Sequence, residues 1–327
     1  MFDMPKKSQS SSNRTFRTAR YLVRHENGIL AIILAILVVV TAVITKGKSV
    51  SLRNLENVLF QVSTRGIASV GQLLVILTGG IDLAIGGLAT LCLVLSGILT
   101  IGLHSAPMAI GGIIAVMLLV GIGVGGVNGL SVSRLGMPAL IVTLAVWRVT
   151  YGISLYVTGV QGMIPVSSPV LQFLGRLTPA VFIAVIVAAY ILLHYSTFGR
   201  SIYATGGNPT SAWLSGIKVK NILLYVYLIS GFLAGLSSVL ILGRNMASSV
   251  QGAGALELDT IAAVCIGGVS LAGGRGSLIG VLLGVIVLGV INNALNLVGV
   301  SVYTQEVVKG FLIIGAVAGD TLRRRER

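Results

Sequence analysis

An almost continuous apolar stretch runs from residue 29 to residue 319, and only short polar or glycine- and proline-containing segments interrupt it. A membrane-spanning helix needs about 20 mostly apolar residues, so this stretch can hold roughly nine to eleven spans with short connections. The chain is 55% hydrophobic and 10% charged, whereas soluble proteins are roughly 45–50% apolar and about 25% charged. The sequence therefore predicts an all-α polytopic membrane protein with no room for a soluble catalytic domain.

We expect about ten membrane spans, one for each apolar run. The runs lie near residues 29–45, 65–79, 82–103, 107–130, 138–159, 177–195, 221–243, 259–272, 277–298 and 303–319. The second run is shorter than a straight crossing needs. One of the helices over residues 65–103 is therefore predicted to be broken, near residues 79–87.

The formal charge of +14 is concentrated in the tails and in short loops. Residues 1–28 and 320–327 form two basic tails around a transmembrane domain over residues 29–319. Because basic segments stay on the cytoplasmic side, we expect both termini in the cytoplasm and an even number of spans. Membrane topology explains these charges, and they do not favour a nucleic-acid partner.

One carboxylate, that of Asp82, lies among paired glycines inside the apolar sequence. A carboxylate at mid-bilayer costs at least about 3 kcal/mol on insertion scales, and glycine pairs loosen a helix where its backbone can face a cavity. The segment 78–86, Thr-Gly-Gly-Ile-Asp-Leu-Ala-Ile-Gly, is echoed by 266–274, Ile-Gly-Gly-Val-Ser-Leu-Ala-Gly-Gly. This similarity fits an internal repeat that marks a central solute pathway, and it also fits chance in a glycine-rich membrane sequence.

Several polar side chains within the predicted spans are able to hydrogen-bond a solute. Asn292 and Asn296 are four residues apart and share one helix face. For each asparagine, a hydrogen bond between neighbouring helices is the alternative interpretation. The residues predicted to line a translocation path are Gln72, Asp82, Asn128, Asn292, Asn293 and Asn296.

The longest polar inner loop covers residues 196–220 and contains a short predicted helix. Asn208 can cap this helix, Pro209 suits its first position and Gly216 suits its end. An exposed apolar helix on such a loop is typical of a docking surface, and a lid that lies on the bilayer surface is the alternative. The side chains that this helix is expected to present to the cytoplasm are Ala212, Trp213 and Leu214.

Motifs that would indicate catalysis or cofactor binding are weak in this sequence. Residues 121–126 match a G-x-G-x-x-G pattern, but they lie inside an apolar run, where small residues favour close helix packing over nucleotide binding. No histidine has cysteine or acidic residues at ligand spacing, and no nucleophile has a positioned base, so we expect neither a metal site nor an enzyme. Glu257 and Asp259 are interpreted as charges at a helix start. Cys92 and Cys265 lie in apolar runs, so a disulfide framework is not expected.

Three parts of the chain together resemble the permease subunits of bacterial ribose/xylose/arabinose-type ABC sugar importers, within the branched-chain amino acid and monosaccharide permease superfamily. They are residues 77–83, the loop motifs at 206–208 and 214–217, and the block 274–277 that leads into 289–293. The resemblance covers nearly the whole chain. Its motifs are specific to the family and do not indicate a particular sugar.

The resemblance implies a permease in the bacterial inner membrane that moves a monosaccharide by alternating access and does not alter it chemically. It implies four kinds of partner: a second permease copy or a paralogue, a cytoplasmic ATP-binding-cassette subunit, a periplasmic or lipid-anchored sugar-binding protein, and membrane lipid. ATP and magnesium would bind to the ATPase partner, and this chain would hold no cofactor. Asp82 is then assigned to gating at the broken helix rather than to direct sugar contact.

In this family the loop over residues 196–220 would be the coupling loop. The residues expected to couple to the ATPase are Gly206, Gly207, Asn208, Ala212, Leu214, Ser215, Gly216 and Ile217.

An ion- or proton-coupled secondary transporter of a small polar solute is the alternative function. A lone membrane carboxylate and a glycine-broken repeat are also expected there, but such a transporter has no need of an apolar docking helix. The chain also departs from its relatives in the fifth span. It has Ala145 after Thr-Leu, and Arg148 nearby, where related permeases often carry a glycine and a later Arg-Gly pair. No particular sugar is therefore carried over.

Overall fold

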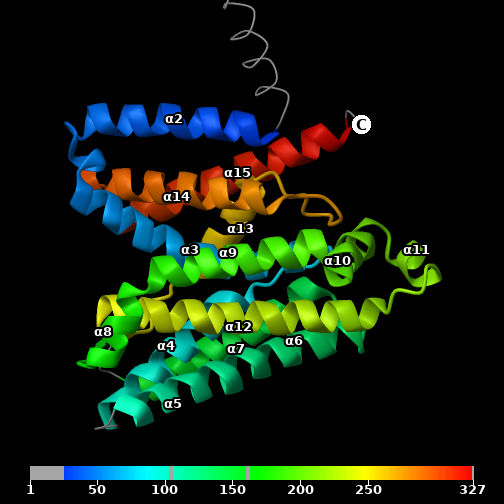
Figure 1. The fold of residues 1–327 in the computed structure, drawn as a ribbon, viewed down its shortest axis with the longest axis horizontal. Coiled ribbons are helices and arrows are strands. Elements are labelled where there is room, and N and C mark those ends of the chain that lie inside the picture. The colour runs from blue at the N-terminus through cyan, green and yellow to red at the C-terminus, as the bar shows by residue number, and fades with distance from the viewer. Residues whose placement is uncertain (1–25, 103–105, 160–162, 326–327) are drawn as a thin grey trace, which may run out of the picture.

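The computed structural model describes residues 26–102, 106–159 and 163–325, and almost all of its elements are helices (Figure 1). The predicted tail over residues 1–28 lies outside the described residues except for its last three positions. In chain order the elements are α2 (Glu26–Ile44), η1 (Lys48–Val50), α3 (Leu52–Leu77), α4 (Ala84–Gly102), α5 (Ala106–Val116), η2 (Met117–Ile122), α6 (Gly123–Ser133), α7 (Ala139–Thr158), β1 (Met163–Pro165), α8 (Pro169–Arg176), α9 (Thr178–Tyr195), α10 (Thr197–Gly207), α11 (Pro209–Leu214), α12 (Val219–Asn245), β2 (Ala247–Ser249), α13 (Leu256–Ile266), α14 (Leu278–Val298) and α15 (Val302–Arg325).

The long helices run along one axis of the molecule and place different short elements at its two ends (Figure 1). Helices α10 and α11 lie at one end, which we call the α11 end. Helix α8 lies at the other end, together with the antiparallel pair of β1 and β2, in which Met163 pairs with Ser249. We call this the sheet end. Helix α12 connects the two, since it starts directly after the α11 segment and ends directly before β2.

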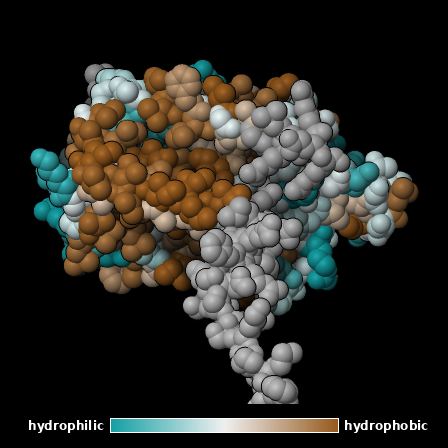
Figure 2. Space-filling model, turned by 90° about the horizontal axis from the view of Figure 1, so that it is seen from above, coloured by the Kyte–Doolittle hydropathy of each residue, from teal (hydrophilic) through white to brown (hydrophobic). Residues whose placement is uncertain are grey.

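The prediction of an all-α polytopic membrane protein is confirmed. Within the described residues, seven helical segments are long and apolar enough to cross a membrane. They occupy seven of the predicted runs, and α4, α13 and α15 occupy the other three. Figure 2 shows a broad apolar area on one face, with polar residues gathered toward the two ends, as a protein surrounded by lipid requires.

Several predicted spans differ from the structure in length, among them the second and the eighth. The second is not short, because α3 has 26 residues and starts at Leu52, well before residue 65. Its first half carries polar side chains and so resembles a loop in the sequence; some of them, such as Asn54, are buried against protein, and others, such as Arg53 and Glu56, are exposed. The eighth is shorter than predicted, because α13 ends at Ile266 after 11 residues and the chain is then non-helical up to Ser277.

The helix break predicted near residues 79–87 is found at residues 78–83, between α3 and α4, and residues 84–87 are already helical. The second break follows α13. In both breaks the chain turns at glycines with a left-handed backbone: Gly79 has φ 84° and Gly273 has φ 87°. The segments that echo one another in sequence are therefore both breaks between helices.

Helix α12 lies at the centre of the bundle and packs against α3, α4 and α6. The glycine pattern at residues 121–126 forms part of this packing. A Cβ at Gly121 would lie 2.9 Å from the carbonyl oxygen of Gly231, and a Cβ at Gly125 would lie 2.5 Å from that of Tyr227. The interpretation of this motif as a helix contact is confirmed.

Candidate translocation pathway

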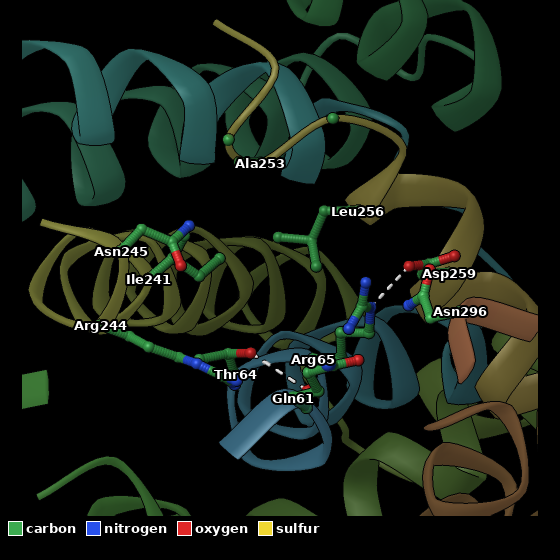
Figure 3. Close-up of a pocket in the computed structure, with 12 residues that line it drawn as sticks. Gln61, Thr64, Arg65, Ile241, Arg244, Asn245, Ala253, Leu256, Asp259 and Asn296 are labelled. Carbon is green, nitrogen blue, oxygen red and sulfur yellow. Dashed lines mark hydrogen bonds and ion pairs between the residues drawn. The ribbon is translucent and has the colours of Figure 1, made fainter. Parts of the chain in front are cut away.

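A polar cavity of about 310 Å³ opens at the sheet end of the bundle (Figure 3). Its walls come from α3, α12, the start of α13 and the end of α14, together with the glycine-rich segment that follows β2. We call it the outer pocket. Its polar lining residues are Gln61, Thr64, Arg65, Arg244, Asn245, Asp259 and Asn296.

An ion network forms one side of the outer pocket. The Nε of Arg65 lies 2.7 Å from Oδ2 of Asp259, and Nζ of Lys309 lies 3.0 Å from Oδ1 of the same carboxylate. Lys309 also contacts Glu306 at 2.9 Å. Asp259 does lie in the first turn of α13, as predicted, and its carboxylate also joins α3, α13 and α15. Lys309 lies within the last predicted apolar run, and these two carboxylates are its protein partners.

Two buried amides lie farther from the sheet end on the same helices. Gln72 is two turns beyond Arg65 on α3, and Asn292 is one turn before Asn296 on α14. Their exposed fractions are 0% and 3%. Neither side chain has a hydrogen-bond partner among the described residues. Since an unsatisfied buried amide is costly, these two groups are available to a hydroxyl-bearing solute or to water.

Asn293 and Asn296 have protein partners instead. Asn293 and Asn54 exchange two side-chain hydrogen bonds of 2.9 Å and 2.8 Å that join α14 to α3. Asn296 accepts a hydrogen bond of 2.8 Å from Gln305 through Oδ1, although it also borders the outer pocket. The contacts of Asn293 fit the alternative interpretation, a hydrogen bond between helices.

Asp82 is part of a separate polar cluster at the first break. Its carboxylate accepts a hydrogen bond of 2.8 Å from Ser230 on α12 and one of 3.0 Å from the amide of Ala84, the first residue of α4. Asn128 on α6 donates a long bond of 3.5 Å to it. Asp82 is buried among these groups. These contacts support the assignment of Asp82 to holding the break rather than to touching solute.

The two breaks meet each other and the end of α10. The amide of Gly274 donates a hydrogen bond of 2.9 Å to the carbonyl of Leu77, the last residue of α3. Gly206, in the last turn of α10, packs directly against this hydrogen bond. A Cβ at Gly206 would collide with the Leu77 carbonyl oxygen and the Gly274 nitrogen. We call this contact of residues 77–79, 206 and 273–274 the glycine junction.

A hydrogen bond reinforces the glycine junction from α10. The hydroxyl of Tyr203 donates to the carbonyl oxygen of Gly276 at 3.1 Å. Burial raises the pKa of Tyr203 above its usual value of 10.0, so the hydroxyl keeps its proton at neutral pH. Helix α10 is therefore fixed to the second break by a side-chain contact as well as by close backbone packing.

The short helix α11 has the caps that the sequence predicts. The Asn208 side chain accepts a hydrogen bond of 2.9 Å from the amide of Ser211, Pro209 is the first helical residue, and Gly216 turns with φ 85°. Trp213 and Leu214 are 67% and 73% exposed. The prediction for Ala212 is wrong: its side chain is buried, because it lies on the helix face turned toward the bundle.

The sequence interpretation missed the outer pocket. Gln61 lies before the predicted second span, and Arg65 is its first residue. Asn245 follows the predicted seventh span. One signal did exist: Arg65, Asp259 and Lys309 are charges of opposite sign at or within apolar runs, and such charges usually pair. No cluster of metal-binding side chains occurs among the described residues.

Residues 54–317 match the family model described as the permease component of branched-chain amino acid transport systems. The chain belongs to this permease family. The match includes α11, the outer pocket and the glycine junction, and it confirms the family resemblance of the sequence motifs.

Curated relatives of this permease match it along most of its length. The ribose import permease protein of Escherichia coli K12 is 34% identical over 332 residues, which cover 97% of this chain and 99% of the relative. The fructose import permease protein of Rhizobium meliloti is 34% identical and covers 90% of this chain and 85% of the relative. The galactose/methyl galactoside import permease protein of Escherichia coli K12 is 35% identical, with 91% and 94% covered. No solved structure matches the permease.

Proposed function

We propose that this permease is the membrane subunit of an ABC importer that carries a monosaccharide into the bacterial cytoplasm. It would lie in the inner membrane with a second copy or a paralogue, with an ATPase subunit on the cytoplasmic side and a soluble or lipid-anchored sugar-binding protein outside. ATP and magnesium would be bound by the ATPase. The relatives named for ribose, fructose and galactose import support this substrate class.

The observation that carries the proposal is the exposed tip of α11. A tryptophan and a leucine on a capped helix of six residues, held outside the bundle, form an apolar surface suited to a protein partner. A groove of about 720 Å³ lies beside it, lined by Trp213 and Ile217 and by the basic side chains of Arg134, Lys218 and Lys220. We assign the α11 end to the cytoplasm and the sheet end to the outside, and under this assignment both termini would lie in the cytoplasm.

Alternating access follows from the position of the glycine junction. Helix α11 is joined to α10 through Asn208, and the last turn of α10 packs on the backbone of both breaks. Only α10 would therefore lie between α11, where the ATPase would act, and the helices that flank the two breaks, which are α3, α4, α13 and α14. The solute would enter at the outer pocket, pass the amides of Gln72 and Asn292 and leave at the α11 end. Only binding and motion are required of this chain.

The proposal is tested by purifying the tagged permease in mild detergent and identifying its partners by mass spectrometry. We expect an ABC ATPase subunit with the native chain and its loss in the variant Leu214→Asp, since a charge at the apolar tip would be buried at the interface. The matched control is Thr197→Asp, which adds the same charge at the α11 end, on an exposed residue in the first turn of α10.

Two results would contradict the proposal. One is a permease that purifies without an ATPase and transports normally. The other is equal loss of the ATPase in Leu214→Asp and Thr197→Asp, which would show that added charge, and not the tip of α11, determines binding.

A further inference from the structure

The outer pocket has the size and the chemistry of a site for one small polar molecule. Its volume of about 310 Å³ is at the lower end of the range for ligand pockets, roughly 300–1,000 Å³. A single monosaccharide suits such a volume, and an oligosaccharide does not. The pocket opens at the sheet end, on the side from which the proposed importer takes up its solute.

Hydrogen-bonding groups in the outer pocket are free to bind a ligand. Arg65 uses only its Nε for Asp259, so its two Nη groups have no partner within the described part of the chain. The side-chain amides of Gln61 and Asn245 also form no hydrogen bond with described residues. Figure 3 shows Gln61, Arg65 and Asn245 around the same space. Guanidinium and amide groups offer both donors and acceptors, which is what a polyhydroxyl solute requires.

The charges around the outer pocket are nearly balanced. Arg65 and Lys309 are neutralised by Asp259 and Glu306 within the ion network. Arg244 stacks on the ring of Phe60, with its guanidinium carbon 5.3 Å from the ring centre, and its Nη1 points to the carbonyl oxygen of Asn57. Glu257 faces α4, because its carboxylate lies against Gly86. Arg244 is then the one basic side chain of the pocket lining without an acidic partner among the described residues, and its guanidinium can donate to the hydroxyl oxygens of an uncharged ligand.

The outer pocket is also aligned with the unpartnered buried amides. Gln72 lies about 10 Å beyond Arg65 along α3, on the same face, and Asn292 lies one turn beyond Asn296 along α14. Among the described residues, no aromatic ring lines the pocket, and the stacking that usually strengthens sugar binding is not found there. Weak binding is what a transport pathway needs, because the solute has to leave again.

We infer that the outer pocket is a sugar-binding subsite within the permease itself, in which Gln61, Arg65 and Asn245 bind the hydroxyl groups of one neutral monosaccharide. The subsite rests on the proposed import function and adds to it a place where the permease itself selects the solute. Arg65 is the central group, and Asp259 is a positioning residue that orients its guanidinium.

Transport in a reconstituted system provides the first test. The permease, its ATPase and its binding protein are placed in proteoliposomes. Uptake of radiolabelled D-ribose, D-fructose and D-galactose and the rate of ATP hydrolysis are measured in the same samples. The variants Gln61→Leu and Asn245→Leu remove one polar group each. The matched control is Gln251→Leu, an exposed glutamine on the same loop region that does not line the pocket.

We expect the amount of sugar moved per ATP to fall about fivefold in Gln61→Leu and in Asn245→Leu, since one hydrogen bond contributes on the order of 1 kcal/mol. Stimulation of ATP hydrolysis by the loaded binding protein stays at the native level, because docking and coupling are unchanged. Gln251→Leu behaves like the native chain. Equal sugar-to-ATP ratios in all three variants would overturn the subsite.

Direct binding provides the second test. Saturation-transfer NMR of the permease alone in nanodiscs, with the sugar that the importer carries, is expected to show contact in the native chain and in Gln251→Leu, and a weaker signal in the two pocket variants. D-Galacturonate is expected to compete poorly, and stronger competition by this anion would overturn the neutral ligand class.

The two proposals fail in different ways. If the native assembly moved none of the three sugars, nor any other monosaccharide, with ATP, the import function itself would fail. If it moved one of them and the pocket variants kept both transport and the NMR contact, only the subsite would fail.

Discussion

The outer pocket and the glycine junction are two regions of the helical bundle that are built in different ways. The outer pocket is built from long polar side chains, among them Gln61, Arg65 and Asn245, that come from different helices and leave groups unpartnered. The glycine junction is built mainly from backbone, since Gly206 packs against Leu77 and Gly274 with no side chain between them, and the Tyr203 hydroxyl adds one bond beside it. One region is suited to hold a solute, and the other is suited to transmit motion.

This difference determines how each region should respond to mutation. A polar pocket tolerates the loss of one side chain with a modest loss of binding, because other groups and water remain. A backbone contact between three segments tolerates no added atom, because packed interiors are not deformable without cost. The predictions below test this contrast, beginning with the largest expected effect.

Gly206→Ala should abolish transport, because its Cβ would collide with the backbone of both breaks. Overpacking of this kind costs about 1–3 kcal/mol, and here it separates α10 from α3. Gly152→Ala on α7 is the control, since a Cβ at Gly152 meets nothing within 4 Å. ATP-driven uptake in proteoliposomes measures both. Equal activity of the two variants would show that the glycine junction does not transmit the motion.

Asp82→Ala should destabilise the first break, because Ser230 and the amide of Ala84 would lose their acceptor. Each buried group left unsatisfied costs about 1–3 kcal/mol. Asp82→Asn keeps an acceptor oxygen, so a smaller loss is expected. Thermal unfolding in detergent compares the two. Full transport by Asp82→Asn at normal expression would contradict a gating role that requires the charge.

Tyr203→Phe should lower stability by about 1 kcal/mol, the usual net value of one hydrogen bond. Burial raises the pKa of Tyr203, so the native chain holds its proton more tightly than the unfolded chain. This contribution is therefore complete below pH 10 and is lost as the pH rises through the folded-state pKa. Unfolding measured at neutral and alkaline pH checks the prediction, and a variant as stable as the native chain at neutral pH would contradict it.

The Asn54 and Asn293 pair should show the smallest effect. A double-mutant cycle with Asn54→Ala and Asn293→Ala is expected to give a coupling of about 0.6 kcal/mol, typical of hydrogen bonds between membrane helices. Stability measured by unfolding in mixed micelles gives this number. A large loss of transport at unchanged stability would instead place Asn293 on the solute path.

The sequence allows the helical architecture, the break after α3 and the caps of α11 to be predicted, because each depends on local signals. Apolar runs mark the spans, Gly79 marks the turn, and Asn208 with Pro209 marks the helix start. The break after α13 was visible only as the similarity of residues 266–274 to 78–86. Its contact with Gly206 depends on packing that no local pattern encodes.

The outer pocket could not be predicted, for a physical reason. Arg65 and Asp259 are 194 residues apart in sequence, and they meet only because α3 and α13 pack together. The polar first half of α3 has the composition of a loop, although Asn54 is buried against α14 and Gln61 and Arg65 border the pocket. Among the residues proposed for the path, Gln72 and Asn292 lie beyond the pocket, whereas Asp82 and Asn293 have structural partners.

The most direct test of the whole account is the energy source of transport in proteoliposomes that contain the permease, its ATPase and its binding protein. We predict that uptake of D-ribose, D-fructose or D-galactose requires ATP on the side of the membrane that carries the ATPase. Uptake continues when a protonophore removes the proton gradient. Uptake that persists without the ATPase and stops with the protonophore would contradict the account and identify a secondary transporter.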